Sequence, residues 1–156
     1  MEKKILIAID DSENAKRAVE FVATTFSPHH RVTVFSVVLD TPAICDLKSP
    51  GLTPYFMSQK AAFCQVEDQQ KVLMKEALKA AKETLVQAGF QEAHVHTKLE
   101  TQKKGVARGI LEEIGAGYDV AVLGRRGVGR VQEFFMGSVS QKVLHSAQDV
   151  SIVLVD

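Results

Sequence analysis

The chain has 156 residues, a length typical of one domain, and 46% of them are hydrophobic. Nineteen Lys and Arg residues balance nineteen Asp and Glu residues, so the formal net charge is zero. This balance argues against a general nucleic-acid binder, which needs a basic excess to neutralise phosphates. The apolar share argues against a disordered chain.

The expected compartment follows from the absence of long apolar runs. The apolar run near the N-terminus is too short for the core of a signal peptide, and no run approaches the roughly 18 residues of a membrane span. We therefore expect a cytoplasmic protein that has no membrane partner. In that compartment Cys45 and Cys64 are expected to be free thiols, with a disulfide or a metal site as the alternative.

Two strands and a helix are predicted in the first quarter of the chain. Residues 5–9 are a continuous apolar run bounded by charges, which is typical of a strand buried on both faces. Residues 10–12 are candidate helix caps, and apolar residues then recur at helical spacing over residues 15–26. Residues 32–39 are rich in β-branched side chains and predict a second strand.

A long loop is expected next, followed by a long helix. Residues 40–64 have no periodicity and are punctuated by prolines, which favours a functional or mobile loop. Helical spacing returns over residues 66–88, and Gly89 is the expected C-cap. The predicted apolar stripe of this helix consists of Leu73, Ala77, Ala80, Ala81 and Leu85.

The second half of the chain alternates between strands and helices. Residues 93–100 alternate apolar and polar side chains, which indicates a strand near a sheet edge, whereas residues 119–123 and 150–155 predict apolar strands. Residues 106–114 and 138–146 predict short helices. Alternation of strands and helices along the chain predicts an α/β fold, a mostly parallel sheet with helices on both faces.

Candidate ligand-binding residues stand at the carboxyl ends of the predicted strands. In an open parallel sheet, ligands bind beyond these ends, where the strand order reverses. Asp10 follows the first strand, Val37 and Val38 close the second, and Gly124 follows the fourth. We expect these residues on one rim of the sheet. For Asp10 a helix cap is the alternative role.

A loop rich in glycine and arginine, residues 124–136, leads into the last predicted helix. Gly137 and Ser138 open that helix, whose free N–H groups and dipole suit a phosphate. The Ser138 hydroxyl either donates to a ligand oxygen or caps the helix. Arg125 and Arg126 either clamp phosphates or belong to a solvated loop.

Two common nucleotide-binding motifs do not fit this loop. A P-loop requires Lys and then Ser or Thr after its second glycine, but Arg130 and Val131 follow Gly129. The dinucleotide motif requires a third glycine three residues after its second, where this chain has Gln132. The loop therefore belongs to neither class.

The pattern that does fit is G-2x-G-9x-G-[ST], beginning at Gly124 and ending in Gly-Ser. Here the chain resembles the ATP-binding branch of the universal stress protein family. Residues 5–13 look like the family's first strand and turn, and residues 137–144 look like its signature region. The resemblance implies a single domain over residues 1–156, with a five-stranded, Rossmann-like sheet similar to adenine nucleotide alpha hydrolases, in the strand order 3-2-1-4-5.

The resemblance also implies ATP as the bound cofactor, with Mg²⁺ or Mn²⁺ as an optional companion. Asp10 would lie near the adenosine, Val38 or its neighbour Val37 would meet adenine through backbone groups, and the glycines would hold ribose and phosphates. The residues that match the family's pattern are Asp10, Val38, Gly124, Arg125, Gly127, Gly137, Ser138 and Val139. No catalytic residue and no protein-built metal site is expected.

The favoured function is a nucleotide-binding regulatory module in the stress response. The alternatives are a slow ATP-hydrolysing or phosphoryl-transferring enzyme at the same site, and an interaction protein without nucleotide. A homodimer is expected through residues 150–155, because this strongly β-forming run would lie at a sheet edge and contains no edge-blocking residue. The resemblance implies the same interface.

Overall fold

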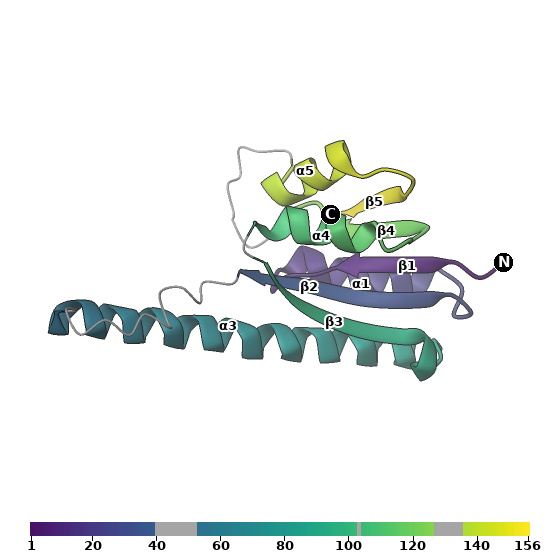
Figure 1. The fold of residues 1–156 in the computed structure, drawn as a ribbon. Coiled ribbons are helices and arrows are strands. Elements are labelled where there is room, and N and C mark those ends of the chain that lie inside the picture. Colours follow the sequence, from purple (N-terminus) through teal and green to yellow (C-terminus); the bar gives the residue numbers. More distant parts are fainter. Residues whose placement is uncertain (40–52, 103, 127–135) are drawn as a thin grey trace.

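A five-stranded parallel sheet lies at the centre of the protein (Figure 1). The computed structural model describes residues 1–39, 53–102, 104–126 and 136–156. The strands are β1 (Lys4–Ala8), β2 (Arg31–Leu39), β3 (Val95–Gln102), β4 (Val120–Gly124) and β5 (Ser151–Val155). The helices are α1 (Glu13–Thr25), α3 (Pro54–Gln87), α4 (Val106–Ile114) and α5 (Ser138–Ser146), with the short 3-10 turn η1 (Glu92–His94) before β3. The strand order is β3-β2-β1-β4-β5, which confirms the predicted α/β fold and the 3-2-1-4-5 order.

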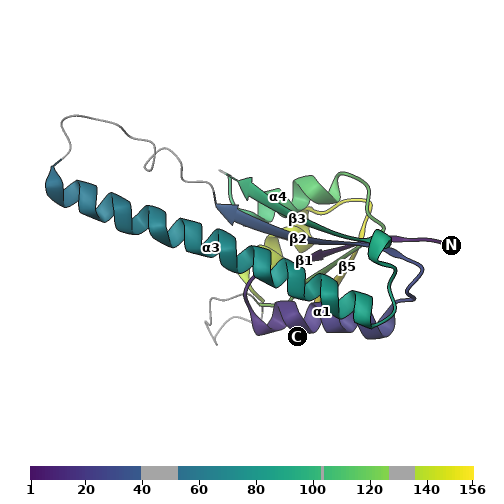
Figure 2. The same cartoon turned by 90° about the horizontal axis from the view of Figure 1, so that it is seen from below.

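Helices cover both faces of the sheet. Figures 1 and 2 show α1 and α3 on one face and α4 and α5 on the other. Successive residues of a strand point to opposite faces, so β1 contributes to both cores. Ile5 and Ile7 pack in the cluster beneath α1 and α3, and Leu6 and Ala8 pack in the cluster beneath α4 and α5.

The long helix α3 begins twelve residues earlier than expected, so the predicted loop over residues 40–64 is too long. Thr53 caps the helix, because its side chain accepts a hydrogen bond from the Phe56 N–H at 3.3 Å. Pro54 occupies the first helical turn, where its missing N–H costs nothing. The proline marks the start of the helix, whereas the sequence pattern predicts it within a loop. Residues 40–52 lie outside the described part of the chain.

The missing periodicity has a physical cause. Helix α3 has 34 residues, about 51 Å at 1.5 Å per residue, and Figures 1 and 2 show its N-terminal half projecting beyond the sheet. Without a core to face, this half carries exposed apolar residues such as Tyr55 and Val66. The buried stripe is also different from the predicted one. It consists of Leu78, Ala81 and Leu85, whereas Leu73 and Ala80 are exposed.

The expectation of free thiols is wrong for Cys64, which is disulfide-bonded in the structure. That expectation rested on the redox compartment, and spacing along the sequence does not report which thiols meet in space. Cys45 lies outside the described residues. None of the described helices combines the length and the apolar character needed to cross a membrane.

Candidate functional site

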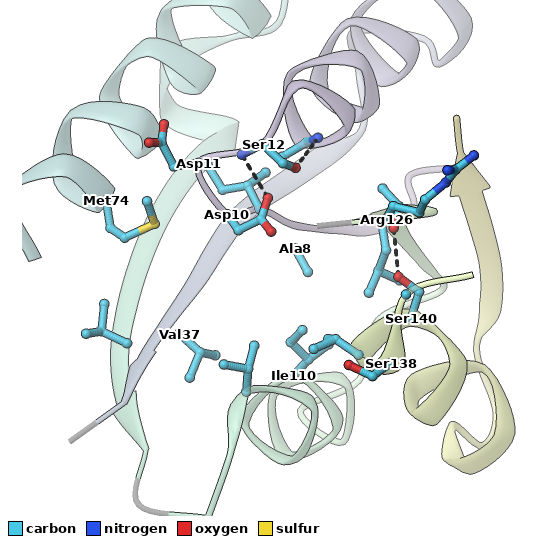
Figure 3. A pocket seen from close by; sticks show the side chains of 18 of the residues that line it. Ala8, Asp10, Asp11, Ser12, Val37, Met74, Ile110, Arg126, Ser138 and Ser140 are labelled. Atoms are coloured by element: carbon cyan, nitrogen blue, oxygen red, sulfur yellow. Dashed lines mark hydrogen bonds between the residues drawn. The ribbon is translucent and has the colours of Figure 1, made fainter. Parts of the chain in front are cut away.

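A cavity of about 610 Å³ opens at the carboxyl edge of the sheet (Figure 3). This volume lies within the range of roughly 300–1,000 Å³ that is common for small-molecule sites. Its walls come from the turn after β1, the end of β2, helices α3 and α4, and the segments that end β4 and begin α5. Because β1 lies between β2 and β4, the cavity sits where the strand order reverses. The rim expected from the sequence is therefore formed.

Six of the eight predicted binding residues line this cavity. They are Asp10, Val38, Gly124, Gly137, Ser138 and Val139. Arg125 is not among the lining residues, and Gly127 lies outside the described part of the chain. Residues more than 100 positions apart in the sequence thus meet at one place.

Arg125 is directed toward the end of the chain instead of the cavity. Its Nη2 lies 2.7 Å from Oδ1 of Asp156, and this hydrogen bond is the main reason that the pKa of Asp156 is below its usual value. The backbone N–H of Arg125 donates to the carbonyl of Val155 at 2.6 Å. Arg125 therefore fastens the end of β5 to the end of β4. The next residue, Arg126, lines the cavity, and Figure 3 shows its guanidinium directed away from Ser138.

Asp10 is not the cap of α1. That role belongs to Ser12, whose hydroxyl accepts a hydrogen bond from the Ala15 N–H at 3.1 Å. Oδ1 of Asp10 accepts a hydrogen bond from the Ser12 N–H at 3.0 Å, which shapes the turn between β1 and α1. Figure 3 shows the Asp10 carboxylate facing into the cavity. The turn thus holds a carboxylate at the cavity wall.

Gly124 is required by close packing against α1. A Cβ atom at this position would lie 2.9 Å from Cβ and 3.0 Å from the carbonyl carbon of Asn14. Real Cβ atoms essentially never approach other heavy atoms this closely. The absence of a side chain at Gly124 therefore has a structural reason that is independent of any ligand.

We expect Gly124→Ala to destabilise the folded protein by about 1–3 kcal/mol, because the added methyl group forces the β4 end and the α1 backbone apart. The urea midpoint should fall while the slope of the unfolding transition stays unchanged. If the urea midpoint did not change, α1 would have to move away from the added methyl group without any loss of stability.

The N-terminus of α5 lies at the cavity wall and has no side-chain cap. Gly137 is the N-cap residue, and Ser138 is the first residue of the helix, so the alternative role of Ser138 as a cap is wrong. The N–H of Gly137 donates to the carbonyl of Arg125 at 2.9 Å, and the Ser140 hydroxyl donates to the carbonyl of Gly124 at 2.8 Å. These bonds fix the start of α5 against the end of β4. The N–H groups of its first turn have no side-chain partner at the cap, an arrangement that suits an anion.

Comparison with known proteins identifies the family. The universal stress protein family model matches residues 1–154. The chain belongs to the universal stress protein family. Two staphylococcal members of the family, from Staphylococcus epidermidis and from the USA300 strain of Staphylococcus aureus, are each 26% identical to it over 153 residues. Each of these matches covers 97% of this chain and 83% of the relative.

Solved structures of family members share the fold. UspA from Lactobacillus plantarum superposes with a TM-score of 0.72 at 18% identity, covering 99% of this chain and 97% of that one. The hypothetical protein MJ0577 superposes with a TM-score of 0.71 at 21% identity, covering 100% and 98%. A universal stress protein in complex with cAMP superposes with a TM-score of 0.62 at 14% identity, covering 99% and 96%. At these identities the superpositions show a common fold.

Several cavity residues of this universal stress protein were missed by sequence reasoning. Gln70, Leu73 and Met74 line the cavity from α3, and Val106 and Ile110 line it from α4. The α4 residues were interpreted only as part of an apolar face. The α3 residues carry a recognisable signal, because they continue the spacing of the buried stripe toward the N-terminus of a helix that is longer than the sheet.

The described residues offer no protein-built metal centre. Within residues 1–39, 53–102, 104–126 and 136–156, no group of three or more His, Cys, Asp or Glu side chains could hold a metal ion. Asp10 and Asp11 are two carboxylates at the cavity. Mg²⁺ is commonly held by one or two carboxylates together with phosphates. These two carboxylates alone do not complete a magnesium site.

Proposed function

We propose that this universal stress protein binds ATP in the cavity at the carboxyl edge of its sheet, and that it acts as a nucleotide-binding regulatory module in the stress response. The observation that carries the proposal is the uncapped start of α5 within a cavity whose other end is apolar. Helix α1 begins at the same cavity but is capped by Ser12. An anion at α5 meets a helix start that no N-cap side chain occupies, and an anion at α1 meets a completed cap and the Asp10 carboxylate.

The charge distribution supports one orientation of the nucleotide. The phosphates would lie at Gly137, Ser138 and Val139, beside the dipole of α5. The adenosine would lie toward Asp10 and Val38, where a carboxylate can accept hydrogen bonds from ribose hydroxyls and apolar side chains can cover a ring. If Mg²⁺ or Mn²⁺ accompanies ATP, it would neutralise phosphate charge.

The structural neighbour solved with cAMP supports an adenine nucleotide as the ligand class. The superposition covers 99% of this chain at 14% identity, which shows a common fold. For this chain, the cavity and the start of α5 support the nucleotide.

We further propose that residues 1–156 form one domain that works in the cytoplasm as a homodimer. Strand β5 lies at one edge of the sheet, and its apolar residues from Ile152 to Val155 are half-buried without a partner chain. A symmetric pairing of two such edges would satisfy the outward backbone groups and cover these side chains.

The direct test is calorimetric titration of the nucleotide-stripped protein with ATP. Two or three backbone N–H bonds to a charged phosphate contribute roughly 1.5–3 kcal/mol each before the cost of association. We expect a dissociation constant of about 1 μM, or roughly −8 kcal/mol. If about 1 mM ATP gave no heat of binding and did not compete with another nucleotide for the protein, the proposal would be contradicted.

We expect any ATP hydrolysis to be much slower than the typical enzyme range of about 1–10³ per second. The described cavity carboxylates are Asp10 and Asp11, and Oδ1 of Asp10 already accepts a backbone hydrogen bond. No additional base among the described cavity residues is positioned to activate water. A phosphate-release assay with Asp10→Asn as the control measures this. A rate in the typical range that the substitution abolishes would favour the enzyme alternative.

A further inference from the structure

One face of α3 carries the core stripe past the edge of the sheet and over the cavity. Over the sheet this face presents the buried residues Leu78 and Leu85. One to two turns earlier, the same face presents Gln70, Leu73 and Met74, which line the cavity. Residues spaced three, four, seven or eight positions apart share a helix face. Gln70 is therefore a polar residue on the same helix face that packs in the core further along the helix.

The turn of α3 that carries these residues is attached to the sheet. The hydroxyl of Ser36, which is only 2% exposed, donates a hydrogen bond to Sδ of Met74 at 3.3 Å. Ser36 belongs to β2 and directly precedes Val37, which also lines the cavity. In Figure 3, Met74 lies on the Val37 side of the cavity, across from Ser138. Helix α3 therefore forms the wall at the end away from α5.

The chemistry of this wall suits the edge and face of a heteroaromatic ring. Leu73 is 48% exposed although it lines a cavity, so a ligand would cover apolar surface that is now in contact with water. The thioether of Met74 makes favourable contacts with aromatic rings. Gln70 is exposed, so its amide can turn its donor and its acceptor toward a ligand.

We propose that Gln70 determines base specificity in this protein, with Leu73 and Met74 covering the ring. This inference rests on the proposed function, since it assigns the base end of the same nucleotide site. Adenine presents the N6 amino donor beside the N7 acceptor, and one amide satisfies both. Guanine presents two acceptors, O6 and N7, at the corresponding edge, so the amide satisfies only one of them. Gln70 therefore favours ATP over GTP.

The test compares ATP and GTP binding to the full chain and to Gln70→Leu by competition against a fluorescent ATP analogue. We expect Gln70→Leu to bind ATP about tenfold more weakly and to bind GTP almost unchanged, so the ATP preference nearly disappears. Gln70→Glu keeps the size of the side chain and one acceptor but loses the donor. It should lose a similar part of the ATP affinity while the circular dichroism stays unchanged.

The matched control is Gln69→Leu, which makes the same chemical change one position earlier. Gln69 is exposed and is not among the residues that line the cavity, so both nucleotide affinities should stay unchanged. If the wild-type protein binds ATP and Gln70→Leu retains the same ratio of ATP to GTP affinity, the inference is wrong and the proposed function stands. If the wild-type protein binds no nucleotide, the proposed function fails and the inference fails with it.

Discussion

Gly137→Val should remove most of the ATP affinity and leave the protein folded. The backbone at Gly137 has φ −67° and ψ 152°, an extended conformation that valine adopts readily. The branched side chain would stand beside the first-turn N–H groups of α5, where the phosphates are proposed to lie. Losing one or two charged hydrogen bonds should weaken binding by about 10- to 100-fold.

Gly137→Ala is the graded control for this experiment. Its single methyl group should weaken ATP binding less than valine does, and both variants should lose a similar stability of about 0.5–2 kcal/mol, because glycine is a better N-cap than alanine or valine. Calorimetry measures the affinity, and thermal unfolding verifies the fold. An unchanged ATP affinity in a folded Gly137→Val protein would show that the phosphates do not lie at α5.

Ile152→Pro should convert the proposed dimer into a monomer without breaking the sheet. The N–H of Ser151 donates to Asp119 at 3.0 Å, and the carbonyl of Val155 accepts from Arg125 at 2.6 Å. Backbone groups of alternate residues point to the same side of a strand, so residues 151, 153 and 155 face β4. The N–H of Ile152 then faces outward, where a second copy of β5 would pair with it. Proline removes this donor.

The matched control is Val153→Pro, which removes an N–H that faces β4 and should destabilise the fold instead of the dimer alone. Light scattering at micromolar concentration gives the mass. We expect about twice the chain mass of 17.1 kDa for the wild-type protein and 17.1 kDa for Ile152→Pro. A wild-type mass of 17.1 kDa would exclude the dimer, and an unchanged dimer in Ile152→Pro would place the interface elsewhere.

The strands of the sheet could be predicted because short, contiguous runs of residues mark them in the sequence. Strand β1 is an apolar run between charges, and its residues are buried on both faces as that pattern predicts. The alternation of apolar and polar residues over residues 93–100 predicts a strand near a sheet edge, and β3 does lie at an edge of the sheet. The pattern predicts helix α3 from residue 66 and misses its first twelve residues, because amphipathic spacing reports contact with a core and the N-terminal half of the helix has none.

The cavity was predictable where it is built from strand ends, and less so elsewhere. Asp10, Val38 and Gly124 could be placed on one rim from topology alone, since parallel strands end at the same edge. Arg125 was misplaced because a loop residue next to a strand can point to either side, and its contact with Asp156 depends on the position of β5. Gln70 was missed because exposed polar residues on a helix are common.

Amide chemical-shift mapping during an ATP titration tests most directly whether ATP occupies the cavity between α3 and α5. We expect saturable shifts at Asp10, Val38 and the first turn of α5, and little change around Arg31 and Tyr118, which line a separate cavity at the opposite edge of the sheet. Saturable shifts confined to Arg31 and Tyr118, or no shifts at about 1 mM ATP, would contradict the account.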